Sequence, residues 1–255
     1  MDAYSGGNIV LLAGTYYISD TVLFTYVGTP DDNITFSGAG DTTILKIPDG
    51  HSTDMTMMWV QGGSGAATIK NVTLKDFKVD GNSENTTGSY IGIRVSLGET
   101  ITLDNITAGN GNAGSMYAIY NNQDTSDLTV TNCDFGTWGI NGLELRHTNT
   151  GTISNNIFTS SRVELYSSNN DLSITGNTFN TTRLMAYTDD GVNRMTNIAI
   201  TGNSFVRAKS VENSVITAGF IDGLTITGNT FNCFDPPVTV LESCTAVTYE
   251  GNTQL

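Results

Sequence analysis

The sequence predicts an all-β protein that winds as a single parallel β-helix, a solenoid of about nine or ten short coils. Three observations predict this fold: a composition that favours strands and tight turns, a heptapeptide that recurs along the chain, and a second strand-like segment after most of its copies. Because no helical pattern lies between these segments, two or three short strands joined by corners make up each coil.

The composition is rich in uncharged polar residues and poor in charge. The 255 residues include 39 Thr, 26 Asn and 28 Gly but only 4 Pro, and charged residues make up 14%. Thr favours strands, whereas Asn and Gly favour turns. A net charge of −14 argues against a basic nucleic-acid binder, and no apolar run approaches the roughly 18 residues of a membrane span.

A heptapeptide of polar, aliphatic, polar, Gly or Asn, Asn, polar and Phe organises the chain. Single copies depart from it at Cys133 (for Asn), Ile157 (for a polar residue) and Ala199 (for a polar residue). Successive Phe residues are 23, 21, 26 and 26 positions apart, and weaker copies precede and follow the five clear ones. A fixed period of this length indicates a repeat architecture. The clear copies are Thr129–Phe135, Thr152–Phe158, Ser173–Phe179, Ala199–Phe205 and Thr225–Phe231.

Stacked coils place equivalent residues above one another at the strand spacing of about 4.8 Å. We therefore expect an asparagine ladder at one corner and an inward stack of phenylalanine rings. The ladder would comprise Asn156, Asn177, Asn203, Asn229 and Asn252. The stack would comprise Phe135, Phe158, Phe179, Phe205 and Phe231. Second strands are expected at 91–95, 142–146, 162–166, 183–187 and 238–241.

These repeats resemble the right-handed parallel β-helix superfamily, which includes pectate lyases, polygalacturonases and bacteriophage tailspikes. The segment GGNIVLLAGTYYI at 6–18, followed by ITFSGAG at 34–40, looks like the first coil of the pectate-lyase-like and tailspike members. The resemblance implies a right-handed coil and a protein that works outside the cell or on a virion. It implies no single activity, because one scaffold hosts lyases, hydrolases, epimerases and inert adhesins.

Members of the superfamily usually carry a capping helix before the first coil, and only five residues precede Gly6 here. Uncapped ends expose unpaired strands. We therefore expect residues 1–255 to be a single β-helix domain of a longer protein, or a subunit whose ends are covered by partner domains, as in a homotrimeric spike.

The catalytic signatures of the superfamily are absent from the sequence. Neither His51 nor His147 lies in the Gly-His-Gly of polygalacturonases, and no compact set of calcium carboxylates of the pectate-lyase kind occurs. The adjacent pair Asp189 and Asp190 is a weak calcium candidate, although Asp-Asp-Gly is also an ordinary turn sequence. We expect that no cofactor is required and keep calcium as a candidate ligand.

The strongest candidate site lies on the second strands of consecutive coils. Glu144 and Glu164 alternate with inward aliphatic residues, so both face out in one column, near 5 Å apart, as in a retaining glycosidase. Crowding would raise the pKa of one carboxyl and leave the other ionised. The candidate substrate-binding residues on the same face are Arg146, Arg162, Arg183, Tyr166 and Tyr187.

Other interpretations of this face remain open. The same residues fit an ordinary cross-strand ion-pair ladder or a face that binds carbohydrate without cleaving it. We expect a protein that engages a polysaccharide, as a tailspike-type hydrolase or lyase or as a non-catalytic adhesin or structural spike. The Thr-x-Thr array on the first strands makes an ice-binding solenoid a remote alternative. Cys133, Cys233 and Cys244 are expected to be buried thiols, with a 233–244 bridge as the alternative.

Overall fold

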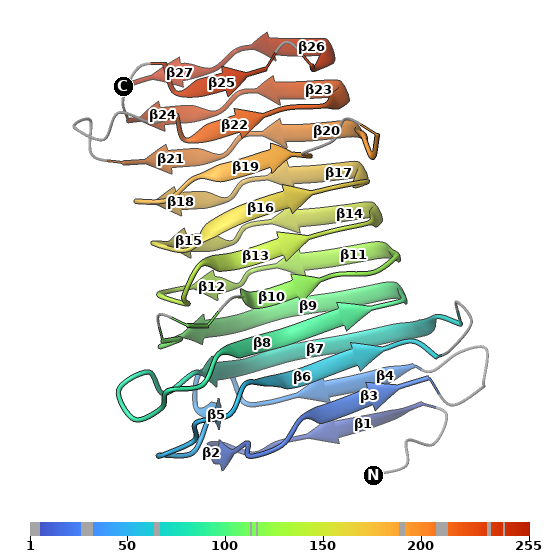
Figure 1. Ribbon diagram of the computed structural model, residues 1–255, viewed down its shortest axis with the longest axis vertical. Helices are drawn as coiled ribbons and strands as arrows, with labels where there is room; N and C mark the ends of the chain where they lie inside the picture. Colours follow the sequence, from blue (N-terminus) through green and yellow to red (C-terminus); the bar gives the residue numbers. More distant parts are fainter. Residues whose placement is uncertain are drawn as a thin grey trace.

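The computed structural model describes residues 6–26, 33–63, 67–112, 114–115, 117–188, 192–207, 214–233, 236–241 and 243–255. The described residues form a right-handed parallel β-helix whose turns follow one another in sequence order along the long axis (Figure 1). Each strand pairs in parallel with its equivalents in the adjacent turns. The predicted fold class is confirmed. Among the described residues, no helix is long and apolar enough to cross a membrane.

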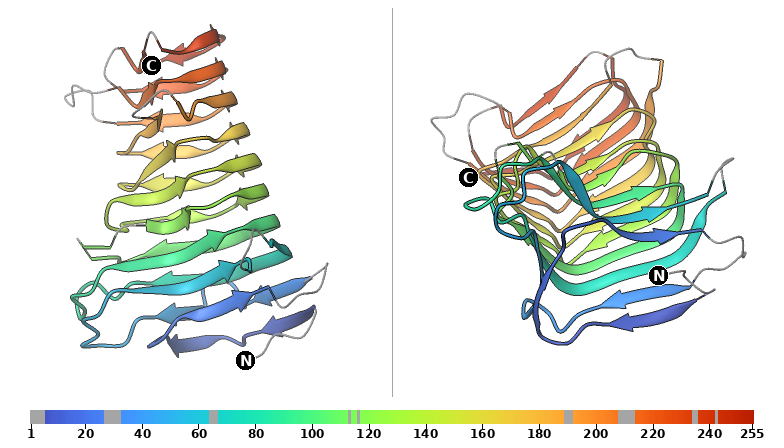
Figure 2. Two further views of the ribbon diagram at one scale, coloured as in Figure 1. Left: turned by 45° about the vertical axis from the view of Figure 1, so that its right-hand side comes forward. Right: turned by 60° about the horizontal axis from the view of Figure 1, so that its bottom comes forward.

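The strands form two sheets, which run along the stack on different sides (Figure 2). Sheet B has nine described strands, one from each of nine turns, and its order is β25-β22-β19-β16-β13-β10-β8-β6-β3. Sheet A has eighteen described strands, in which a long strand is followed across a corner by a short one in most turns.

The strands of sheet B are β3 (Val22–Thr25), β6 (Met55–Gln61), β8 (Tyr90–Ser96), β10 (Tyr117–Asn121), β13 (Asn141–Leu145), β16 (Arg162–Tyr166), β19 (Leu184–Tyr187), β22 (Ile216–Ala218) and β25 (Val238–Val240). The five second strands that were expected from the sequence agree with these bounds to within one residue at each end.

The strands of sheet A are β1 (Gly7–Val10), β2 (Gly14–Tyr17), β4 (Ile34–Ser37), β5 (Thr43–Lys46), β7 (Ile69–Asp80), β9 (Gly98–Gly109), β11 (Thr125–Thr131), β12 (Asp134–Phe135), β14 (Thr148–Ser154), β15 (Ile157–Thr159), β17 (Asn170–Thr175), β18 (Thr178–Asn180), β20 (Met195–Thr201), β21 (Ser204–Val206), β23 (Ile221–Thr227), β24 (Thr230–Asn232), β26 (Thr245–Glu250) and β27 (Thr253–Gln254).

One corner position of the heptapeptide requires a left-handed backbone, which accounts for its Gly or Asn. At the end of the first strand the dihedral φ is between 51° and 66° in every turn from the third to the tenth. Gly adopts this region without steric cost, and Asn and Asp tolerate it better than other residues. The residues at this position are Asp76, Asn105, Asn132, Asn155, Gly176, Gly202, Gly228 and Gly251.

The next position carries the asparagine ladder, as predicted. Each of the first four ladder residues donates its backbone N–H and its side-chain Nδ2 to the Oδ1 of the asparagine one turn further on, at 2.9–3.1 Å. Its Nδ2 also donates to a backbone carbonyl of the preceding turn. Cys133 occupies this position in its own turn and donates its N–H to Asn156. The ladder satisfies buried backbone groups that the corner would leave unpaired.

The phenylalanine stack is also confirmed. The five rings are buried, and neighbouring centroids lie 4.5–5.2 Å apart with interplanar angles of 7–20°. They line one side of a continuous core that also contains Trp138, which is fully buried and therefore contributes to packing. The three cysteines are free thiols, so the alternative bridge between Cys233 and Cys244 is not formed. The Thr-x-Thr residues pair in register on sheet A.

Candidate functional site

The outer side of sheet B carries the predicted site residues. Leu143 and Leu145 point into the core, so the side chain between them points outward, and the same alternation holds on the neighbouring strands. Strand register brings one outward residue of each turn into a column along the sheet. This column, which we call the central column, comprises Trp59, Arg94, Tyr120, Glu144, Glu164 and Met185.

Glu144 and Glu164 lie directly opposite each other in the central column. Neither carboxylate is freely exposed, however, because Glu144 is 2% and Glu164 is 7% accessible. Neighbouring side chains on the outer face cover both groups. The sequence predicts their shared column but carries no signal of this burial, since the covering side chains belong to several turns.

Both carboxylates are fully engaged by hydrogen-bond donors. Asn141 Nδ2 donates to Oε2 of Glu144 at 2.7 Å and to Oε2 of Glu164 at 2.9 Å. Arg146 Nε donates to Oε1 of Glu144 at 2.6 Å. Arg162 Nη2 lies 3.4 Å from Oε2 of Glu164, whose Oε1 accepts from the Tyr187 hydroxyl at 3.2 Å.

Burial is the largest influence on the pKa of Glu144 and raises it above the ordinary glutamate value. The adjacent Arg146 guanidinium and the Asn141 amide lower the pKa, whereas the Glu164 charge raises it further. The crowding that the sequence analysis invoked therefore acts in the expected direction, but desolvation acts more strongly. Burial, followed by the Glu144 charge, also raises the pKa of Tyr117 to about 12.

Asn141 reaches the carboxylates because of a β-bulge. The register between β13 and β16 shifts by one residue between Asn141 and Leu143. Such a shift turns a side chain to the other face of the sheet. Sequence reasoning missed Asn141, and the only local signal for it was the Asn-Gly dipeptide at the start of the strand.

Aromatic rings and guanidinium groups cover the carboxylates and extend along the face. Arg146 lies 4.7 Å from the ring centroid of Tyr166 and 5.7 Å from that of Tyr120. Tyr120 stacks on Tyr117 at 4.3 Å, and Tyr187 contacts Tyr166 edge to face at 5.8 Å. Cation–π contacts of this kind hold the arginine side chains in place.

The same arrangement continues towards the N-terminal turns. Arg94 lies 4.5 Å from the ring centroid of Trp59, and the indole Nε1 donates to Ser96 at 3.0 Å. The sequence places Arg94 on the face of Glu144 but gives no sign that Trp59 lies beside it, because the two residues are 35 positions apart and no clear heptapeptide links their turns. The structure places both on that face.

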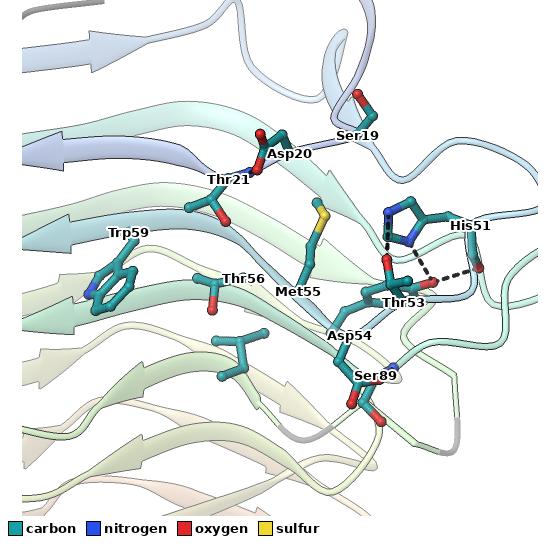
Figure 3. Close-up of a pocket in the computed structure, with 12 residues that line it drawn as sticks. Ser19, Asp20, Thr21, His51, Thr53, Asp54, Met55, Thr56, Trp59 and Ser89 are labelled. Carbon is teal, nitrogen blue, oxygen red and sulfur yellow. Dashed lines mark hydrogen bonds between the residues drawn. The ribbon is translucent and has the colours of Figure 1, made fainter.

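A cavity of about 520 Å³ lies at the N-terminal end of this face (Figure 3). In Figure 3 Trp59 lies at one end of the cavity and His51 at the other. The imidazole of His51 lies 3.4 Å from the hydroxyls of Thr53 and Tyr90. The other residues that line the cavity are Ser19, Asp20, Thr21, Asp54, Met55, Thr56, Ser89 and Ile91.

A second cavity, of about 370 Å³, lies at the corner that leads from β15, β18 and β21 into β16 and β19. It contains two of the predicted substrate-binding residues, Arg162 and Arg183, together with Arg207. Sequence reasoning missed Arg207, which directly follows a short sheet A strand. The remaining lining residues are Ile140, Ser160, Thr181 and Thr182.

A column of side chains beside the central column, which we call the side column, connects the two cavities. Register places Thr56 opposite Ile91, Ile91 opposite Tyr117, Tyr117 opposite Asn141, and Asn141 opposite Arg162. Thr56 and Ile91 line the first cavity, and Arg162 lines the second. Three strand spacings, about 14 Å, separate Ile91 from Arg162.

The weak calcium candidates Asp189 and Asp190 lie outside the described residues. Within the part of the chain that the structure describes, no group of three or more His, Cys, Asp or Glu side chains could hold a metal ion. Calcium binding stays a prediction.

Several solved β-helix structures resemble the whole chain. The A-module of mannuronan C-5 epimerase AlgE6 from Azotobacter vinelandii matches with a TM-score of 0.75 at 19% identity over 98% of this chain and 68% of that chain. The DFA-IIIase of Arthrobacter chlorophenolicus A6 matches with a TM-score of 0.56 at 11% identity, over 98% of this chain and 77% of that chain. The Dettilon tailspike protein matches with a TM-score of 0.53 at 14% identity, over 96% of this chain and 55% of that chain.

No protein-family model matches the sequence, and no curated protein matches it either. The structural matches nevertheless place the chain among the right-handed parallel β-helix proteins, as the repeats predicted. At identities below 20% they show the fold, while the chemistry of the site depends on this chain's own residues.

Proposed function

We propose that the protein binds a polysaccharide along the outer face of sheet B, outside the cell or on a virion. The observation that carries this proposal is the register of the side column, which places residues of both cavities in one column on the same sheet. Three strand spacings, about 14 Å, separate them, a span that a short oligosaccharide covers, so one glycan chain would reach both cavities.

The chemistry of the face fits a sugar ligand. Carbohydrate sites combine aromatic surfaces, which pack on the apolar face of a sugar ring, with side chains that hydrogen-bond its hydroxyls. Trp59 and Tyr120, which are both half-buried, provide the rings, and Tyr117 supports Tyr120 from below. Hydroxyl, amide and guanidinium groups surround them on the same strands.

The structural neighbours add support of a general kind. One is named for its action on mannuronan and another is a tailspike protein. A β-helix that engages glycans at a cell or virion surface is consistent with both. The expected homotrimer or end-covering partner domains remain part of this proposal.

Binding to a panel of immobilised bacterial and plant polysaccharides tests the proposal. We expect retention on at least one polymer, and Trp59→Ala should weaken it about three- to tenfold because a ring surface is lost. Tyr249→Ala is the matched control, since Tyr249 is an exposed aromatic residue on β26 of sheet A. Equal losses in both variants, or no retention on any polymer, would contradict the proposal.

A second candidate function is cleavage of the bound polysaccharide. The observation in its favour is the direct pairing of Glu144 with Glu164, together with the raised pKa of Glu144. Glu144 would protonate the leaving oxygen while the Glu164 carboxylate attacks the anomeric carbon, and water would then release the sugar from Glu164. The substrate would first have to displace Arg146, which covers Glu144.

Release of reducing ends or unsaturated products distinguishes this candidate from simple binding. If the protein is a hydrolase of this kind, Glu144→Gln and Glu164→Gln should each abolish release while binding is retained. Product release that survives both substitutions would exclude these carboxylates as the catalytic pair. Binding without product on every glycan that is retained would favour the adhesin.

A further inference from the structure

We infer that the cavity lined by Arg162, Arg183 and Arg207 binds the anionic substituent of an acidic polysaccharide, either a carboxylate or a sulfate ester. The inference rests on the proposed function and names the class of polysaccharide that the face would select. Neutral glycans would lack the group that this cavity recognises.

The arginines are unevenly distributed over the molecule. The protein has a net charge of −14 and only six arginines. Five of these lie on sheet B or at the corners beside it, and three of the five meet in this one cavity. The described residues that line the cavity include no carboxylate. Positive charge is therefore concentrated in one cavity of an otherwise acidic molecule.

The guanidinium groups of Arg162 and Arg183 differ in their hydrogen-bond partners. Arg162 is held from the Glu164 side, because its Nε donates to Asn141 Oδ1 at 2.5 Å and its Nη2 lies 3.4 Å from Glu164. Among the described residues, the Arg183 guanidinium has no hydrogen-bond or ion-pair partner. Arg183 thus presents unused donors to the cavity in a planar fork that matches a carboxylate or a sulfate.

The three guanidinium groups lie close enough to repel one another. Burial is the main cause that lowers the pKa of Arg183, and the neighbouring Arg162 and Arg207 charges lower it further. Like charges held together are relieved when an anion binds between them.

The backbone fixes the three arginines independently of any ligand. The N–H of Val163, next to Arg162, donates to the carbonyl of Arg183 at 3.1 Å, and the N–H of Arg207 donates to Asn232 at 2.9 Å. The hydroxyls of Ser160 and Thr181 pair across the same corner at 3.2 Å. The backbone of this corner is therefore ordered before a ligand binds, which limits the entropy that is lost on binding.

The cavity can be tested first without a polymer. Arginine side-chain Nε–H resonances of the isotope-labelled protein would be titrated with glucuronate, glucose 6-sulfate and glucose. We expect the Arg183 resonance to shift with one or both anions and not with glucose, and the preferred anion identifies the substituent. An Arg183 resonance that neither anion shifts would overturn the inference, whatever the polymer experiments give.

The second test compares polysaccharides of matched backbone, one carrying uronate groups and one with those groups reduced to alcohols, together with a sulfated polymer. Arg183→Ala should weaken binding of the acidic polymer about tenfold at low salt, because a charge-assisted bidentate contact is lost, and Arg183→Lys should recover part of the loss. Arg194→Ala is the matched control, since Arg194 pairs with Asp222 at 2.6 Å outside the cavity.

The outcomes separate the inference from the proposed function. Equal binding of the acidic and reduced polymers, with no effect of Arg183→Ala, would overturn the inference and leave polysaccharide binding intact. Anion-dependent shifts of Arg183 without retention on any polymer would support the anion site and contradict the proposed function. Raising the ionic strength should weaken the specific binding, because the guanidinium groups are partly exposed to solvent.

Discussion

Glu144 and Glu164 lie opposite each other on adjacent strands and share one hydrogen-bond donor, the Asn141 amide. Arg146 and Arg162 each contribute a cation to one of the two carboxylates. Two like charges in one buried place would repel strongly without these partners. The network therefore makes the pair compatible with folding, and it positions the arginines that face outward.

The first prediction concerns the pH dependence of stability at Glu144. Its folded-state pKa is raised, so the folded protein takes up a proton that the unfolded chain binds only at lower pH. The free energy of unfolding of the wild type relative to Glu144→Gln should therefore rise as the pH falls from 7 towards the ordinary glutamate pKa of about 4.3. Urea denaturation at several pH values measures this difference.

Glu99→Gln supplies the control for that experiment. Glu99 lies on sheet A, is only half-buried and pairs with Lys70 at 2.6 Å, so Glu99→Gln removes an ion-paired carboxylate without the deep burial of Glu144. A difference between wild type and Glu144→Gln that stays flat, or that falls as the solution becomes more acidic, would contradict the raised pKa.

The second prediction concerns Asn141. Replacing it with Ala removes the shared donor of both carboxylates and the acceptor of Arg162, and it leaves these buried groups unsatisfied. We expect a loss of about 2–4 kcal/mol in the free energy of unfolding. Asn149→Ala is the matched control, because Asn149 is exposed and, among the described residues, its side chain accepts a hydrogen bond from Asn170 alone. A loss at Asn141 no larger than at Asn149 would show that the network is not structural.

The repeats made the fold predictable, whereas the site was predictable only in part. The Asn and Phe residues recur once per turn, so the sequence alone shows which residue of the next turn each one contacts. Asn177 and Asn203, for example, occupy equivalent positions in successive turns and are hydrogen-bonded. The same logic placed Glu144 beside Glu164. Asn141 escaped it because a bulge breaks the strict alternation of the strand.

The remaining site residues escaped prediction for a different reason. Arg207 lies at a corner whose length varies between turns, and Trp59 belongs to turns without the heptapeptide. Their neighbours are set by packing between distant segments. Burial also depends on several turns together, so no local pattern could show that Arg146 and Tyr120 cover the carboxylates.

The third prediction concerns the asparagine ladder. Asn177→Ala removes the acceptor of the Asn156 backbone N–H and the donor to the Ile153 carbonyl, both of which are buried at the corner. Each unsatisfied buried group costs about 1–3 kcal/mol. We expect chemical denaturation to show a loss of about 2–5 kcal/mol in the free energy of unfolding.

Asn252 provides an internal comparison, because it ends the described ladder and is only half-buried. Asn252→Ala should therefore cost clearly less than Asn177→Ala, since water can reach the groups that it leaves unpaired. Equal losses in the free energy of unfolding for the two variants would mean that the burial of a ladder asparagine does not determine how much it stabilises the fold.

The fourth prediction uses a thiol as a reporter of opening of the stack. Cys133 is buried in the turn that precedes Asn156, and burial raises the pKa of its thiol to about 12. Because the thiolate is the reactive form, Cys133 should resist alkylation in the folded protein. Cys244 is only half-buried and should react first.

A variant with Cys233→Ser and Cys244→Ser leaves Cys133 as the single thiol. Its labelling rate should then follow the equilibrium population of opened molecules, so that Asn177→Ala increases the rate in proportion to its loss of stability. Measurement of the rate by mass spectrometry at several urea concentrations tests this link. Fast labelling without denaturant would show that the corner opens locally, and it would contradict the view that the ladder and the phenylalanine stack hold the turns together as one cooperative unit.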